Sequence, residues 1–155
     1  MLLLVFQAGG ARYGLEAAGI IEILPPVALR PFPQMSCEVA GLLNHRGKIV
    51  PVLDLTGIIT GLPTRLRMSS RIVVVDFPTA AGERHPLGLL AEHATETIQC
   101  REQDFQPAGI QTPEAPFSGD ILVHGDETVQ KVELRRLLPV ELQQRLFTAA
   151  AEASA

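Results

Sequence analysis

The sequence of 155 residues contains no tryptophan, a single tyrosine and only two cysteines. Because grooves that bind proline-rich peptides are lined by aromatic side chains, this shortage disfavours a generic peptide-binding module. Cys37 and Cys100 lack the paired spacing of a metal site, and two thiols do not make a disulfide framework. The cysteine content therefore indicates a protein of a reducing compartment, the cytoplasm.

Positive charge is also scarce. The 13 Lys and Arg residues are outnumbered by 17 Asp and Glu residues, the formal net charge is −4, and the basic residues form no run. Nucleic-acid binding requires a surface that neutralises phosphates, so we expect no nucleic-acid partner. No apolar stretch reaches the roughly 18 residues of a transmembrane helix, and the apolar residues 1–6 are too few for a signal peptide. These absences predict a cytoplasmic protein that does not insert into a membrane.

The sequence also lacks the usual catalytic motifs, including GxSxG, GxGxxG and the phosphate-binding loop. Its histidines are His45, His85, His93 and His124. None of them has the HxxxH or HExxH spacing of a zinc site. Glu92 and Glu96 could act as an acid–base pair, although such a pair usually marks an exposed face. We therefore expect no enzymatic activity, cofactor or metal; the alternative is a small hydrolase or ligand-binding enzyme that uses Cys37 or the histidines.

A tight hairpin is the best-defined element that the sequence does contain. In residues 41–55 two apolar runs flank Asn44-His45-Arg46-Gly47, and Asn and Gly readily adopt the positive φ angles of such a turn. Asp54 can then cap a short helical turn over residues 55–59. Arg46 lies at the tip with no acidic residue within seven positions. It is therefore either a solvated turn residue or a protein contact, since arginine is enriched at interface hot spots.

Short apolar runs separated by turn residues predict a mainly β chain. Besides the hairpin, strands are expected at residues 2–7, 13–16, 20–24, 71–77, 87–91, 95–99, 121–124 and 128–132. Pro51 implies an edge strand or a bulge at its position. Brief helical turns are expected at 17–19 and 133–138. Pro139 favours the start of a final amphipathic helix, whose alanine-rich end (148–155) is expected to fray.

The two halves of the chain repeat each other. Gly14-Leu15 is followed by Glu22 eight residues after the glycine, and Gly88-Leu89 is followed by Glu96 at the same distance. Each half then closes with a histidine at a hairpin tip, a strand, and an acidic residue followed by leucine. Two such matches in the same order imply a structural duplication, and each half has the strand spacing of a small barrel.

We therefore predict an all-β architecture of two small barrels packed side by side. Barrel 1 is expected at about residues 14–66 and barrel 2 at about 71–134, with the chain ends contributing to the neighbouring barrel. Residues 139–155 are expected to form a C-terminal helix and tail. A groove between the two barrels would have apolar walls and would suit a binding protein.

The sequence resembles CheW-like domains over about residues 2–138. The resemblance lies in Tyr13-Gly14-Leu15, Glu22-Ile23, the hairpin block 41–55, Arg71-Ile-Val-Val-Val and Leu87-Gly-Leu-Leu-Ala. The most specific part is the pattern Asn-x-Arg-Gly-x-x-x-Pro-x-x-Asp-Leu within the hairpin block. It implies that residues 1–155 form a single CheW-like domain, whose fold is two tandem SH3-like β-barrels.

The resemblance also implies a function. CheW-like proteins that stand alone are non-enzymatic adaptors that couple chemoreceptors to a CheA-type histidine kinase in a cytoplasmic array at the membrane. The groove between the barrels would hold the cytoplasmic tip of a methyl-accepting chemoreceptor, and the outer faces would meet the regulatory domain of the kinase. By position, the protein-binding residues would be Arg46, Ile20, Glu22, Ile72, Ala94 and Thr97.

The sequence departs from the family pattern at several of these positions. His45 replaces the frequent leucine before the arginine, and Glu92 stands where aspartate is usual. Ala94 and Thr97 are smaller or more polar than the valines common in the family. These differences leave open an adaptor of a non-flagellar chemosensory pathway, such as one controlling cyclic-di-GMP output, and, as a further alternative, a generic SH3-like peptide-binding module.

Overall fold

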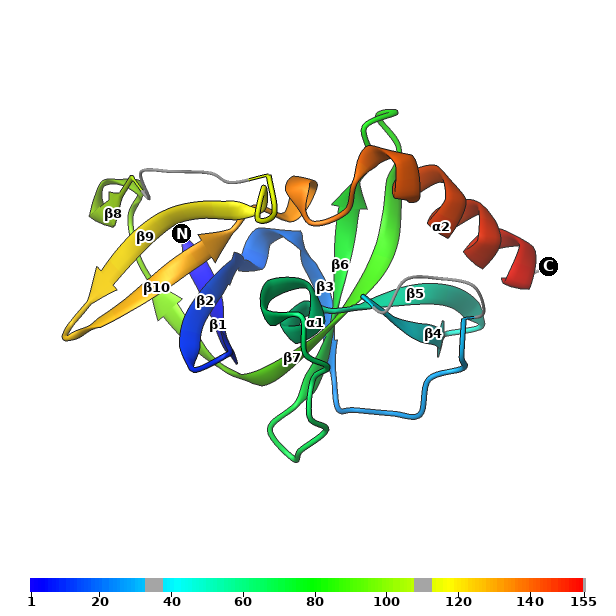
Figure 1. Ribbon diagram of the computed structural model, residues 1–155, viewed down its shortest axis with the longest axis horizontal. Helices are drawn as coiled ribbons and strands as arrows, with labels where there is room; N and C mark the ends of the chain where they lie inside the picture. Colours follow the sequence, from blue (N-terminus) through cyan, green and yellow to red (C-terminus); the bar gives the residue numbers. More distant parts are fainter. Residues whose placement is uncertain (33–37, 108–112, 155) are drawn as a thin grey trace.

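The computed structural model describes residues 1–32, 38–107 and 113–154. In these residues, ten strands form two small barrels joined by one long strand (Figure 1). The terminal barrel, which contains the N-terminal strand, comprises β1 (Leu2–Ala8), β2 (Ala11–Glu16), β8 (Phe105–Gln106), β9 (Ser118–His124) and β10 (Glu127–Val132). The middle barrel comprises β3 (Ile20–Leu24), β4 (Val39–His45), β5 (Lys48–Asp54) and β6 (Arg71–Pro78).

The long strand β7 (Arg84–Gln99) belongs to both barrels. Its first part pairs antiparallel with β6 and parallel with β5, and from Glu92 onward it pairs with β1. The change of barrel coincides with His93, whose φ angle is 50°. The sequence predicted two separate strands here, at 87–91 and 95–99. The structure has one, because both parts find partner strands and no proline or glycine interrupts residues 89–99.

The strand pairing groups the chain differently from the expected division at 14–66 and 71–134. β6 and the first part of β7 complete the middle barrel with β3, β4 and β5, whereas β1 and β2 pair with β7 and β10 in the terminal barrel. The first half of the chain thus places β1 and β2 in the terminal barrel and β3 to β5 in the middle barrel. The second half places β6 and the first part of β7 in the middle barrel and its later strands in the terminal barrel. The first half divides in this way because only the 3₁₀ turn η1 (Ala17–Gly19) separates β2 from β3. The chain therefore passes from the terminal barrel to the middle barrel directly after β2.

The repeated glycines lie where the two parallel strand pairs approach closely. Gly14 of β2 is opposite Lys131 of β10, and Gly88 of β7 is opposite Val52 of β5. A Cβ atom on Gly88 would lie 2.8 Å from Cγ2 of Val52, and one on Gly14 would lie 3.2 Å from Cγ1 of Val129. The Gly-Leu repeat in the sequence therefore marks positions where a neighbouring side chain occupies the space of a Cβ.

These distances predict unequal costs for adding a methyl group. Gly88→Ala should lower the free energy of unfolding by about 1–3 kcal/mol, because the new Cβ would lie only 2.8 Å from Cγ2 of Val52, so that something in the core must shift. Gly14→Ala should cost less, because its nearest contacts are at 3.2 Å and a shift of a few tenths of an ångström would relieve them. Chemical denaturation of both variants measures the difference. Equal costs, or a larger cost at Gly14, would contradict this account of the repeat.

Among the described residues, three apolar cores hold the fold together. One lies inside the terminal barrel, including Leu3, Val5 and Val129, and one inside the middle barrel, including Ile72 and Val74. The third, which we call the central core, lies between the barrels and contains residues from both, among them Leu4, Phe6, Leu15, Leu53, Val73, Val75, Leu87 and Leu89. Alternate β6 residues thus enter different cores. This burial on both faces explains the uninterrupted run of valines.

Two α-helices in the described part of the chain complete the fold. The short helix α1 (Leu55–Thr60) begins as the sequence predicted, with the Asp54 carboxylate accepting the Gly57 N–H at 3.0 Å, and ends at Gly61, whose φ angle is 79°. The predicted C-terminal helix is present as α2 (Val140–Ser154). The prediction that its end frays from residue 148 is wrong as far as Ser154, whose hydroxyl oxygen accepts the Ile49 N–H of β5 at 3.0 Å.

The 3₁₀ turns and the position of Pro51 largely follow the sequence predictions. The 3₁₀ turns η1 and η3 (Leu134–Arg136) occur where brief helical turns were expected, and a further turn, η2 (Glu102–Asp104), was not predicted. Pro51 precedes residues 52–54, the part of β5 that pairs with β7. In the described pairing it therefore has a neighbour only in β4, as expected for an edge position.

Candidate protein-binding site

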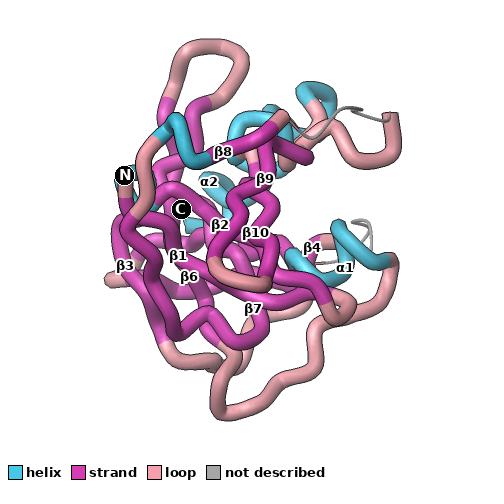
Figure 2. The backbone as a smooth tube through the Cα atoms, turned by 90° about the vertical axis from the view of Figure 1, so that its left-hand side faces the viewer, coloured by secondary structure: helices cyan, strands magenta, loops and turns pink. Residues whose placement is uncertain are grey.

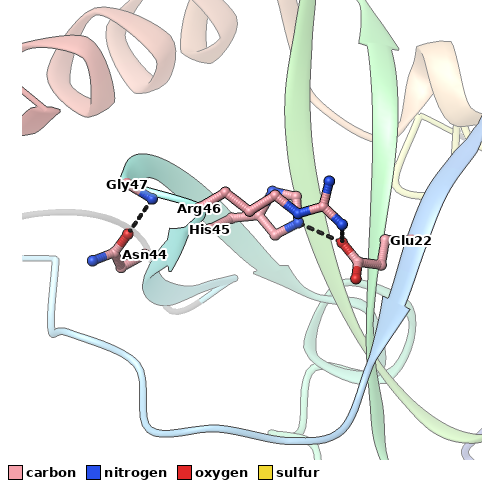
Figure 3. A network of polar contacts seen from close by, with 5 residues as sticks. All are labelled: Glu22, Asn44, His45, Arg46 and Gly47. Carbon is pink, nitrogen blue, oxygen red and sulfur yellow. Dashed lines mark hydrogen bonds and ion pairs between the residues drawn. The ribbon is translucent and has the colours of Figure 1, made fainter.

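The tip of the β4–β5 hairpin projects one arginine into solvent. Arg46 and Gly47 have φ angles of 54° and 83°, the left-handed conformation of a two-residue hairpin turn, and the Gly47 N–H donates to the Asn44 side-chain oxygen at 3.0 Å (Figure 3). The Arg46 side chain is 76% exposed. The local sequence thus sets the backbone conformation from which this side chain projects.

A carboxylate from a different strand neutralises this arginine. Glu22 of β3 accepts a hydrogen bond from Arg46 Nη2 at 3.2 Å, and its Oε2 lies 2.6 Å from His45 Nε2 (Figure 3). We call Glu22, His45 and Arg46 the ionic cluster. The sequence predicted both Glu22 and Arg46 as contact residues but gave Arg46 no partner, because Glu22 is 24 positions away and is brought close only by the barrel.

The cluster alters the acidity of its carboxylate. The hydrogen bond from His45 is the main influence that lowers the pKa of Glu22; partial burial opposes it, and the charges of Arg46 and His45 act in the same direction as the hydrogen bond. Glu22 therefore remains an anion at neutral pH, paired with the guanidinium of Arg46.

This shift leads to a prediction about pH. The folded-state pKa of Glu22 lies below its ordinary value of 4.5, so the favourable interactions of the carboxylate are present above that value and are lost as the pH falls through the folded-state pKa. His45→Leu removes the main cause, and the Glu22 titration midpoint should move upward. Side-chain carbon NMR measures both midpoints, with His124→Leu, at an exposed hairpin position, as the control. An unchanged midpoint in His45→Leu would show that His45 does not hold this carboxylate.

Exposed isoleucines flank Glu22 along β3. Ile21 and Ile23 are 52% and 43% exposed, and Ile20 is partly buried against the central core. Within the described residues β3 pairs only with β6, so its other edge has no partner strand. The β3 strand therefore combines accessible apolar side chains with the carboxylate that holds Arg46.

A β-bulge explains how these side chains are distributed. Ile20 is opposite Val75 and Glu22 is opposite Val74, so Ile21 has no counterpart on β6. Directly paired residues share a face of a sheet, and thus Ile20 points toward the central core while Glu22 points to the other face. The sequence gave no signal for this bulge, and the exposed Ile21 was not among the predicted site residues.

Two of the predicted site residues are buried and must be corrected. Ile72 is fully buried in the core of the middle barrel, opposite Leu24 of β3, and Ala94 is 2% exposed in the central core. Their side chains have no surface to offer a partner. Ile72 lies on a strand whose two faces are covered, and Ala94 lies on the buried face of a part of β7 whose other face is exposed. Position in a family pattern does not reveal this burial.

Thr97 is exposed but lies in the other barrel. It is located on the last part of β7, opposite Leu4 of β1, and the described contacts do not connect it with the ionic cluster. The structure thus brings together Glu22 and Arg46, places Ile20 on the same strand as Glu22, and leaves Thr97 separate.

The residues considered for catalysis have other surroundings. Cys37 lies outside the described residues, whereas Cys100 is buried, and this burial raises the pKa of its thiol. Glu92 accepts the Arg65 N–H and Glu96 pairs with Arg12, so the two carboxylates have separate partners. His85 stacks on Phe147, with ring centroids 4.6 Å apart. In the described parts of the chain, no three His, Cys, Asp or Glu side chains are grouped as a metal would require.

Comparison with known proteins shows which protein family has this fold. The CheW-like domain family matches residues 2–141, and the chain therefore belongs to this family. The structure superposes with a TM-score of 0.77 on the crystal structure of the scaffolding protein TtCheW from Thermoanaerobacter tengcongensis, at 26% identity, over 90% of this chain and 88% of the other. The predicted fold of two tandem SH3-like barrels with a C-terminal helix is thus confirmed.

Individual members of the family are also similar to this chain. The chain is 23% identical over 145 residues to the chemotaxis protein CheW of Rhizobium meliloti, which covers 90% of this chain and 88% of the relative. It is 30% identical over 69 residues to the protein FrzA of Myxococcus xanthus, covering 44% of this chain and spanning only 43% of FrzA. The longest helix, α2, has 15 residues, and in the described part of the chain no helix has the length and apolar character that a membrane crossing requires.

Proposed function

We propose that this protein is a non-enzymatic adaptor that couples the cytoplasmic tip of methyl-accepting chemoreceptors to the regulatory domain of a CheA-type histidine kinase. It would act in a cytoplasmic chemosensory array. Membership of the CheW-like family and similarity to a CheW of a chemotaxis system support this proposal. The similar crystal structure is that of a protein named as a scaffold.

The observation that carries the proposal is the combination of the ionic cluster with the exposed isoleucines of β3. Protein interfaces concentrate their binding energy in apolar anchors and arginines that are surrounded by polar groups excluding water. Ile21 and Ile23 supply apolar contacts, and Arg46, fixed by Glu22, supplies a directed guanidinium group. An amphipathic helix, the form of a receptor tip, binds such a surface through its apolar face.

The way in which the barrels are joined suits an adaptor. The central core contains side chains from both barrels, and β7 runs without interruption from one to the other. Surfaces on the two barrels are therefore held at a fixed separation and orientation. A protein that holds receptor and kinase in such a fixed relation lets a small receptor movement favour one kinase state by differential contacts.

Co-elution tests this function. The purified protein is applied to a size-exclusion column with a receptor cytoplasmic tip and, separately, with a CheA-type regulatory domain. Binding to both supports the adaptor function. Binding to neither would overturn it and leave a CheW-like fold with a different role.

A further inference from the structure

The segment that follows α1 extends away from the barrels. In two perpendicular views the backbone between α1 and β6 projects beyond the strands on one side of the molecule, at the bottom of both pictures (Figures 1 and 2). This segment, residues 61–70, is here called the basic loop. It displays Leu62, Leu66 and Met68, which are 68%, 67% and 95% exposed. These are the three highest values among the exposed large apolar side chains of the described residues.

The exposure does not come from a lack of structure. The Asp54 carboxylate accepts the Thr64 N–H at 2.9 Å, and the Glu92 carboxylate accepts the Arg65 N–H at 2.8 Å. The hydroxyl oxygen of Ser70, which is fully buried, accepts the Arg67 N–H at 2.9 Å. These bonds fix the backbone at its middle and at its end. An ordered loop that presents apolar side chains loses little conformational entropy on binding.

The same loop is positively charged. Arg65 and Arg67 are exposed, and the described residues provide no carboxylate partner for either. The carboxylates of Asp54 and Glu92 contact the loop through its backbone N–H groups. The sequence has no acidic residue from Leu55 to Val75, although the whole chain carries a net charge of −4. The basic loop is thus a local region of positive charge on an acidic protein.

We propose that the basic loop is a second docking surface, which binds a short acidic amphipathic segment of a partner protein. The exposed apolar side chains would cover the apolar face of the segment, and Arg65 and Arg67 would pair with its carboxylates. This surface shares no residue with the ionic cluster, so the proposal does not depend on the adaptor function.

Charge and size favour a protein over other anionic partners. Binding to a nucleic acid or to an anionic membrane gains energy from many basic residues acting together. The basic loop offers only two arginines without a carboxylate partner, and the overall negative charge of the chain would repel an extended anionic surface. A segment of a few turns with carboxylates on one side matches both the extent of the loop and its charge.

A designed peptide tests the proposal on the full-length protein. The probe is a fluorescent 15-residue helix with leucines on one face and glutamates beside them, and its counterpart has lysines in place of the glutamates. We expect the acidic peptide to bind, with amide NMR shifts concentrated in residues 61–71. Binding should weaken at least about tenfold with Arg65→Glu/Arg67→Glu and with Leu66→Ser/Met68→Ser.

A matched control excludes a general charge effect. Arg135 and Arg136 are also exposed and have no carboxylate partner in the described structure, so Arg135→Glu/Arg136→Glu should leave peptide binding unchanged. Equal weakening by this control, no binding of the acidic peptide, or equal binding of the lysine peptide would overturn the proposal. So would Arg65- and Arg67-dependent binding to vesicles of anionic phospholipid, or to a single-stranded oligonucleotide, that exceeds binding of the peptide. The thermal unfolding temperature of each variant is measured as well. An unchanged temperature shows that a change in binding comes from the altered surface and not from loss of the fold.

Discussion

Arg46→Asp is expected to weaken receptor-tip binding at least about tenfold, or about 1.4 kcal/mol, and to leave thermal unfolding nearly unchanged. The side chain is 76% exposed, and surface ion pairs such as Arg46–Glu22 contribute little to stability. Aspartate also tolerates the left-handed backbone of the turn, where the φ angle is 54°. Binding should fall because aspartate would face Glu22 with a like charge and remove the directed guanidinium group.

The control for this variant is another paired arginine on the same barrel. The Arg84 side chain is 62% exposed, and its Nη1 lies 3.0 Å from Oδ2 of Asp76. Arg84→Asp therefore removes an equivalent surface ion pair away from the hairpin tip. It should not affect receptor binding. A fall in the unfolding temperature of Arg46→Asp that parallels its loss of binding would contradict the interface role and assign Arg46 a structural one.

A charge exchange separates two ways in which Arg46 can act. In Glu22→Arg/Arg46→Glu the ion pair can form again with its direction reversed. If the arginine matters only because it fixes the hairpin to β3, the double variant should bind the receptor tip normally. Because we propose that the guanidinium itself meets the partner, we expect the double variant to remain defective.

Local signals in the sequence were sufficient to predict much of the fold. The β4–β5 turn follows from Asn44 and Gly47, and α1 follows from the capping Asp54 and from Gly61. Each of these elements depends on residues within a few positions of one another. The duplication was also visible, because Gly14 and Gly88 each lie at a close approach of parallel strands and the chain retains a glycine at both.

The parts that could not be predicted depend on contacts between distant residues. The pairing of Glu22 with Arg46 requires β3 to lie beside the β4–β5 hairpin, and no local pattern states which strand is the neighbour. Likewise, the valine run of β6 predicted a strand but did not reveal that Ile72 is covered from both sides. Residues transferred from a family pattern keep their position in the fold, and their exposure has to be established from the packing.

The exposed isoleucines of β3 provide the second large effect that we expect. Ile23→Lys should weaken receptor-tip binding at least about tenfold, because a lysine in an apolar contact must be stripped of water without a partner charge. The fold should tolerate it, since Ile23 is 43% exposed and lysine is common on edge strands. Ile20→Lys is a poorer test, because Ile20 packs against the central core and its replacement should lower stability as well.

Val123→Lys is the matched control, since Val123 is 49% exposed on β9 of the terminal barrel. It introduces the same charge on a similarly exposed strand position away from the ionic cluster. Isothermal titration with the receptor tip should find normal affinity for Val123→Lys and reduced affinity for Ile23→Lys, at equal unfolding temperatures. Equal affinities of the two variants would place the receptor contact elsewhere, and the ionic cluster would then have to be assigned to the kinase or to neither partner.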